Sequence, residues 1–132
     1  MLDLLSVQIT VLAAVVLAGF FSVFHVLVIV GVVPGTIVWG GRLSERRHVV
    51  WAEVASILLL SATALVFFLN GQSLATGERG VVLTVATWVL VVLFGLNTVG
   101  NLFAKTALER FAFTPITLVL TLLALRLALE GV

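Results

Sequence analysis

The sequence predicts an all-α integral membrane protein, a single domain over residues 1–132 built as a bundle of four transmembrane helices. Hydrophobic residues make up 62% of the chain and charged residues 10%, against about 45–50% and about 25% in a typical soluble domain. Four apolar stretches are each close to or above the roughly 20 residues needed to cross a bilayer core of about 30 Å. A water-soluble fold of this composition would expose larger apolar patches than monomeric proteins usually carry.

The four predicted spans, separated by glycine-rich, turn or charged segments, cover residues 7–33, 49–69, 80–103 and 113–129. The first is expected to break near 31–35, because a helix continuing to residue 39 would be about 50 Å long. A turn is predicted at 70–73, where Asn-Gly-Gln-Ser follows the second span. Thr114 and Pro115 are interpreted as an N-cap followed by a proline at the first helical position.

The distribution of lysine and arginine predicts the orientation in the membrane. The loop between the first two spans carries Arg42, Arg46 and Arg47, and the loop between the last two carries Lys105 and Arg110. The positive-inside rule places both loops in the cytoplasm and both termini outside the cell membrane. The first residues lack the positive segment and cleavage site of a signal peptide, so the first span is expected to remain as a membrane helix.

Several residues near the predicted membrane surfaces have expected roles there. Trp39 and Trp51 suit the aromatic belt at the interface, whereas Trp88 lies deeper and is expected to pack inside the bundle or against a partner. Arg126 and Glu130 are four residues apart near the outer end of the last span, and we expect them to form an ion pair; the alternative is an electrostatic gate or an anion contact on the outer side.

Four polar side chains within the spans are the main candidates for a functional site. An ionisable group at the bilayer centre costs at least about 2.5–3.5 kcal/mol, so its presence is by itself a functional hypothesis. His25 and Asn97 are each about 9 Å, Glu53 about 5 Å and Asn101 about 3 Å from the cytoplasmic ends of their spans. Four polar groups from three spans are therefore predicted at one level, in the cytoplasmic leaflet.

Two interpretations of this level remain open. In the first, His25 and Glu53 pair with each other or with an asparagine and hold the helices together, while Lys105 reaches toward Glu53 from the interface. In the second, the same residues line a polar pocket that is open to the cytoplasm and binds a small polar ligand, a lipid headgroup or a cation. His25 and Glu53 would then be the titratable pair, with Asn97, Asn101 and Lys105 as further ligand-binding groups.

The composition also limits what the chain is expected to bind. Arg42, Arg46 and Arg47 are either determinants of topology or a site for an anionic phospholipid headgroup. The chain has no cysteine and only two histidines, His25 and His48, in different places, so neither a metal site nor a cofactor is expected. A net charge of +1 without a dense basic stretch gives no reason to expect binding to nucleic acid.

Three short runs stand out in the last 40 residues, NTVGNLFAKT at 97–106, Glu-Arg at 109–110 and TPIT at 114–117. In these runs the chain resembles small, uncharacterised four-helix membrane proteins found in many bacteria. The resemblance implies a bacterial inner-membrane protein and implies no activity.

Three classes of function are considered. The first is a transport, ligand-binding or lipid-binding protein, expected to be a homo-oligomer, that uses the cytoplasm-facing pocket. The second is a structural or accessory subunit that binds a partner membrane protein through a helix face, with Trp88 and the cluster Phe20, Phe21 and Phe24 as contacts.

The third class, an enzyme, is the least favoured, and no catalytic residue is predicted. The run at 45–48 that leads to Glu53 is similar to the arginine-rich motif of the membrane-associated eicosanoid and glutathione enzymes. The asparagine of that motif is absent here, and the spacing from arginine to glutamate differs.

Overall fold

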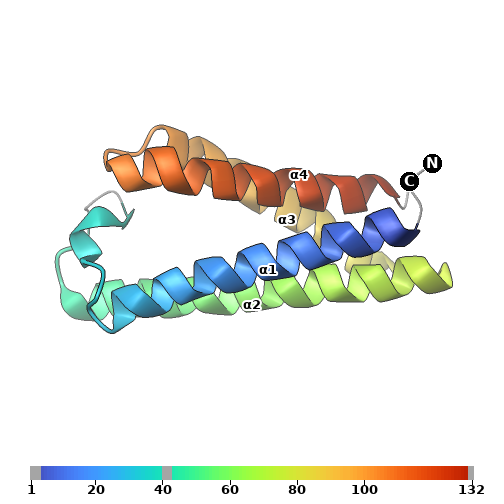
Figure 1. Cartoon of the computed structure of the whole chain (residues 1–132), viewed down its shortest axis with the longest axis horizontal. Helices are drawn as coiled ribbons and strands as arrows, with labels where there is room; N and C mark the ends of the chain where they lie inside the picture. The colour runs from blue at the N-terminus through green and yellow to red at the C-terminus, as the bar shows by residue number, and fades with distance from the viewer. Residues whose placement is uncertain (1–3, 40–42, 131–132) are drawn as a thin grey trace.

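The computed structural model describes residues 4–39 and 43–130, and the described chain is all-α. Its elements are α1 (Leu4–Ile29), the 3-10 helix η1 (Gly35–Ile37), α2 (Arg46–Thr76), α3 (Val81–Leu102), the π-helical segment η3 (Glu109–Phe113) and α4 (Thr114–Glu130). Within these ranges four helices are long and apolar enough to cross a membrane, the fourth formed by η3 and α4 together. The helices run up and down, so η1 and the α3–η3 connection lie at one end and the α2–α3 turn at the other (Figure 1).

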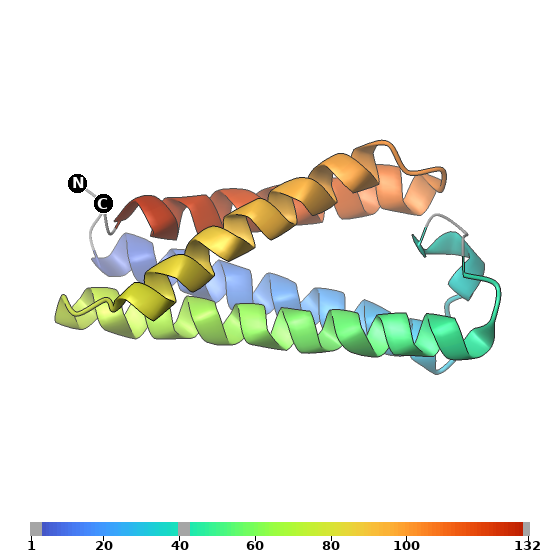
Figure 2. The ribbon, with the colours of Figure 1, turned by 180° about the vertical axis from the view of Figure 1, so that it is seen from behind.

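The bundle consists of two helical hairpins. α1 packs along α2 and α3 packs along α4, with fewer contacts between the two pairs. Figure 2 shows the pairs close together near the α2–α3 turn and diverging toward η1. Small residues permit the close packing within the first hairpin: a Cβ atom on Gly71 would lie 3.1 Å from Val11 Cγ2, and Ala14 and Ala18 are fully buried.

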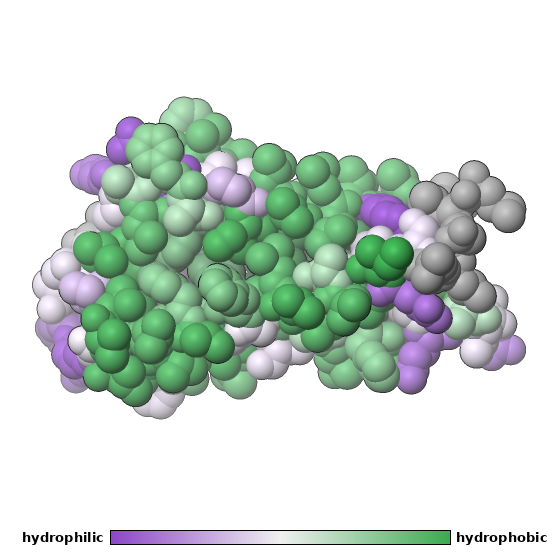
Figure 3. Space-filling model, viewed as in Figure 1, coloured by the Kyte–Doolittle hydropathy of each residue, from purple (hydrophilic) through white to green (hydrophobic). Residues whose placement is uncertain are grey.

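Large apolar side chains cover the outside of the bundle. Leu12, Phe20 and Val82 are 64%, 73% and 85% exposed. Figure 3 shows hydrophobic side chains over most of one face and hydrophilic ones gathered toward its two ends. This distribution is compatible with a lipid environment, because lipid tails are as apolar as leucine.

Arg79 joins the two hairpins at the end where they are close. Arg79 donates to the backbone carbonyls of Leu127 (2.6 Å) and Ala128 (3.2 Å) and to Asn70 Oδ1 (3.1 Å). These bonds satisfy backbone carbonyls near the C-terminal end of α4, where carbonyl groups lack partners within the helix. The pKa of Arg79 is lowered by burial, and the nearby charge of Glu130 offsets this only in part.

The turn predicted at 70–73 is wrong, since α2 continues through these residues to Thr76. Asn70 is fully buried and donates to the Val66 carbonyl and to Thr87 Oγ1, both at 2.8 Å. Its amide is therefore satisfied inside the bundle and does not end the helix. Gly77 ends α2 instead, in a left-handed conformation with φ 77°. At 31 residues α2 is about 46 Å long, well beyond the predicted span 49–69.

The helix start predicted at Thr114 is also wrong, because the chain is already helical at Glu109. Both the backbone N–H and the hydroxyl of Thr114 donate to the Glu109 carbonyl, the hydroxyl at 3.2 Å. Pro115 lacks an N–H, and in a regular helix its ring would collide with the carbonyl four residues earlier. The wider π-helical turn before it accommodates the proline.

The break predicted near 31–35 is confirmed. α1 ends at Ile29, and Gly31 follows in a left-handed conformation with φ 89°. The pair expected between Arg126 and Glu130 is not formed in the described structure; the Arg126 guanidinium donates to Ser6 Oγ at 2.9 Å instead, linking α4 to α1.

Trp51 and Trp88 lie on the outside of the bundle. Trp51 is 72% exposed and Trp88 37% exposed. Trp88 is therefore not enclosed by this chain, and its proposed contact with a partner stays a prediction.

Candidate functional site

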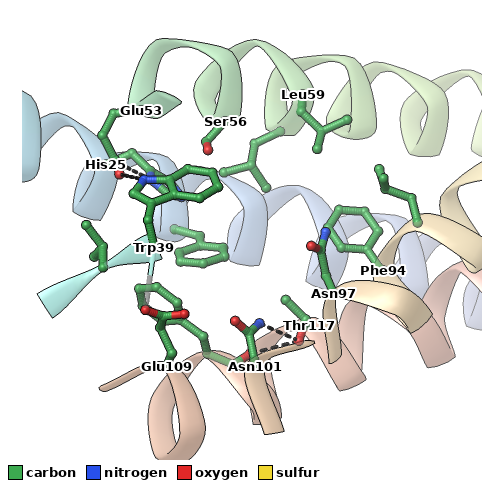
Figure 4. A pocket seen from close by; sticks show the side chains of 15 residues that line it. His25, Trp39, Glu53, Ser56, Leu59, Phe94, Asn97, Asn101, Glu109 and Thr117 are labelled. Atoms are coloured by element: carbon green, nitrogen blue, oxygen red, sulfur yellow. Dashed lines mark hydrogen bonds and ion pairs between the residues drawn. The ribbon is translucent and has the colours of Figure 1, made fainter. Parts of the chain in front are cut away.

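The four polar residues predicted at one level line a single cavity at the η1 end of the bundle (Figure 4). Its volume is about 240 Å³, and its walls come from α1, α2, α3, η3, α4 and the segment after η1. His25 lies on α1, Glu53 on α2, and Asn97 and Asn101 on α3. Lys105 does not line the cavity; it is exposed in the connection after α3, so the structure does not bring it to the other four.

His25 and Glu53 form a buried pair between α1 and α2. His25 Nδ1 is hydrogen-bonded to Glu53 Oε2, and the Trp39 indole N–H donates to Glu53 Oε1 at 2.6 Å. Glu53 has no exposed surface and His25 is 6% exposed. Because both carboxyl oxygens have partners, the burial of Glu53 is compensated by hydrogen bonds. His25 Nε2 has no hydrogen-bond partner among the described residues.

Trp39 reaches Glu53 because the segment before it lies close against α2. A Cβ atom on Gly35 would lie 3.0 Å from Val49 Cγ1, so a larger residue here would have to push the Val49 side chain aside. Trp39 itself has φ 56°, which is rare for a bulky residue and costs about 1–3 kcal/mol. The Trp39 indole N–H is directed to a buried carboxyl group, a role that sequence reasoning missed. The expected place of Trp39 in the interfacial belt stays a prediction.

The start of α2 is tied to the end of α1 by Arg46. Its guanidinium donates to the backbone carbonyls of Val28, at 3.0 Å, and Ile29. Arg46 therefore caps a helix and is engaged within the protein, which leaves less of it for a lipid headgroup. Arg47 is exposed and pairs with Glu45 at 3.1 Å, and Arg42 lies outside the described residues. A headgroup site at these arginines stays a prediction.

The other side of the cavity comes from α3, η3 and α4. The Asn101 amide donates to Thr117 Oγ1 at 3.4 Å. Asn97 is exposed, and its amide has no hydrogen-bond partner within residues 4–39 and 43–130. In Figure 4 the Asn97 side chain extends toward the interior of the cavity beside Phe94.

Glu109 is a lining residue that was placed in a loop by sequence reasoning. It is 8% exposed, and its carboxyl group accepts a hydrogen bond from Thr106 Oγ1 at 3.0 Å. Glu109, Phe113 and Thr117 follow one another at four-residue spacing and are all buried. That spacing, which places the three on one helix face, was the available signal; the N-cap assigned to Thr114 concealed it.

The cavity is closed on one side and open on another. The lining residues from α1, η3 and α4 that are buried are Phe21, His25, Glu109, Phe113 and Thr117. The lining residues that are only partly buried or exposed are Ser56 and Leu59 on α2, Leu93, Asn97 and Asn101 on α3, and Trp39 after η1. The cavity therefore opens between α2 and α3, which belong to different hairpins, and beside Trp39.

The walls combine aromatic surface with a few polar groups. The Phe21 ring lies 4.8 Å from the His25 ring and 4.9 Å from the Phe113 ring, between centroids. An apolar wall with a small number of placed polar groups is the usual composition of a ligand pocket. At about 30 Å³ per water, 240 Å³ holds about eight waters or one ring-sized group.

Comparison of the chain with protein-family models, with curated proteins and with solved structures found no match. The resemblance to small bacterial membrane proteins thus stays a prediction, and the geometry of the cavity is the basis for the function proposed below.

Proposed function

We propose that this chain is a four-span membrane protein that binds a small ligand in the cavity of His25, Glu53, Asn97 and Asn101, as a carrier or a binding protein. One observation carries the proposal: side chains that are costly in a bilayer converge from three helices on one cavity. Interhelical hydrogen bonding accounts for Glu53 and for Nδ1 of His25, which are bonded to each other. It does not account for Asn97, whose amide extends into the cavity without a partner in the described residues.

The proposed orientation places the cavity in the cytoplasmic leaflet, with both termini outside. Four basic residues belong to the segments at the η1 end of the bundle: Arg46, Arg47, Lys105 and Arg110. This grouping supports the orientation through the positive-inside rule. A ligand would enter from the cytoplasmic side or from the surrounding lipid between α2 and α3.

Ligand-dependent thermal stability of the full chain in lipid nanodiscs tests the proposal. A panel of small polar, cationic and lipid-soluble compounds is screened for those that raise the melting temperature of the protein. We expect at least one to do so, and we expect Glu53→Gln and His25→Ala to remove the effect. Glu78→Gln, in the exposed α2–α3 turn, is the matched control and should retain it. If ligands act equally on all four proteins, the cavity is not the binding site.

A further inference from the structure

Building on the proposed function, we infer the chemical class of the ligand. The cavity is suited to a lipid-borne ring with a hydrogen-bond acceptor at each end, as in a quinone. The geometry points to this class because one side of the cavity presents the His25–Glu53 pair, another presents Asn97, and aromatic side chains lie between them (Figure 4).

The His25–Glu53 pair offers a hydrogen-bond donor to the first acceptor of the ligand. Burying a net charge in a low-dielectric site is far more costly than burying a neutral pair, so the pair should hold one shared proton. That proton lies on His25 Nδ1 as an ion pair, or on Glu53 Oε2 with a neutral ring. In both arrangements His25 Nε2 carries a hydrogen, since Nδ1 is the nitrogen that faces Glu53. Nε2 has no partner in the described structure and so offers a donor to a ligand.

The asparagines offer hydrogen-bond donors to the second acceptor of the ligand. The NH₂ group of Asn97 has no partner among the described residues, and that of Asn101 makes only a 3.4 Å contact with Thr117. Each amide NH₂ has two donor hydrogens. A carbonyl oxygen at this end of the ligand would satisfy a group that is costly to leave unpaired in lipid.

The state of the carboxyl groups argues against an organic cation. Both oxygens of Glu53 have hydrogen-bond partners: Oε2 is bonded to His25 Nδ1, and Oε1 accepts from the Trp39 indole N–H. Glu109 accepts a hydrogen bond from Thr106. A cation would have to compete with these partners, whereas a neutral acceptor uses donors that the described structure leaves available.

Size and access favour a ring with an apolar tail. A cavity of about 150 Å³ holds one benzene molecule, so 240 Å³ accommodates a substituted ring but no long chain. The opening between α2 and α3 would let a tail leave into the surrounding lipid. A water-soluble ligand has no need of such an opening.

Quenching of Trp39 fluorescence tests the inference in the full chain in phosphatidylcholine nanodiscs. The chain has three tryptophans, so Trp51→Phe with Trp88→Phe leaves Trp39 alone beside the cavity. The probes are a fully substituted 1,4-benzoquinone with a ten-carbon tail, a benzene ring with the same tail and no carbonyls, and benzyltrimethylammonium. We expect saturable quenching by the quinone, with the carbonyl-free probe failing to compete.

Variants of the donors locate the binding. Asn97→Leu and His25→Phe each remove one donor and should weaken quinone binding roughly two- to tenfold, the range for one hydrogen bond. Thr84→Val, on α3 outside the cavity, should bind as the parent does. Asn97 is exposed, so its replacement by leucine tests binding without disturbing the core.

The outcomes separate the inference from the proposed function. Saturable binding of the ammonium probe but not of the quinone overturns the ligand class and leaves the binding function intact. Quinone binding that is unchanged in both donor variants overturns the inferred contacts. If no compound in this experiment or in the thermal-stability panel binds in a variant-sensitive manner, the binding function fails as well.

Discussion

The His25–Glu53 pair allows a quantitative test of how the two hairpin helices α1 and α2 are held together. Removing one partner of a buried charged pair costs about 3–5 kcal/mol, because the other is left without compensation. Glu53 has no exposed surface, but Trp39 would still donate to it, and a lone carboxyl group can take up a proton. We therefore expect His25→Leu to lower the free energy of unfolding by the lower end of that range, about 3 kcal/mol.

The double replacement should cost much less than the sum of the single ones. With leucine at both positions no polar group is left unpaired between the helices except the Trp39 indole N–H, which lies near the opening. A buried pair replaced by apolar residues of similar size is often neutral in stability. We expect a coupling free energy of about 2 kcal/mol or more between the two positions, within the range for contacting residues.

The assay is reversible unfolding in mixed micelles of a mild detergent and dodecyl sulfate, followed by circular dichroism. His25→Leu, Glu53→Leu and the double variant complete the cycle, and Ser61→Ala, exposed on α2, is the control. Additive single effects, with a coupling near zero, would refute the view that these side chains are stabilised chiefly by each other.

Three further positions are tested by the same unfolding titration, with Arg110→Gln as an exposed control. Arg79→Gln should lower the free energy of unfolding by about 2–3 kcal/mol, because hydrogen bonds to a charged group are lost at the end of α4; Arg110→Gln, which is exposed, should change it by less than about 0.5 kcal/mol. Gly71→Leu should cost about 1–3 kcal/mol by forcing α1 and α2 apart, and an unchanged value would show that the helices are not in close contact there. Trp39→Phe should cost about 1.5–3 kcal/mol through the lost bond to Glu53, and an unchanged value would show that this bond does not stabilise the fold.

The approximate positions of the helices could be predicted from the apolar stretches and the glycines between them, whereas most of the helix ends could not. The break after Ile29 was predictable because glycine and proline end helices by backbone geometry alone. Asn70 was misread because an amide is equally suited to a turn and to a buried interhelical bond, and only the partner Thr87, far away in sequence, decides between them. Pro115 was misread because a π-helical turn permits a proline where a regular helix does not.

The site could be predicted only in part, because the sequence gives the depth of a residue in a span but not the path of a connecting segment. The depth of His25, Glu53, Asn97 and Asn101 could be counted from the span ends, and the structure places all four on one cavity. Depth does not determine which way a connecting segment folds. The return of Trp39 onto Glu53 depends on the close approach of Gly35 to α2, and no periodic pattern in the sequence encodes that contact.

The most direct test of the central claim is whether water-soluble reagents reach the cavity. The chain has no cysteine, so single cysteines can be introduced at Ser56, which lines the cavity, and at Ser61, which is exposed on the same helix away from it. The protein in liposomes is treated with a small charged thiol reagent. A hydrated binding cavity predicts that Ser56→Cys reacts readily, while Ser61→Cys, which the proposed membrane placement puts against lipid, does not. If both cysteines are equally unreactive, water does not reach the cavity, and the claim of a hydrated binding site is contradicted.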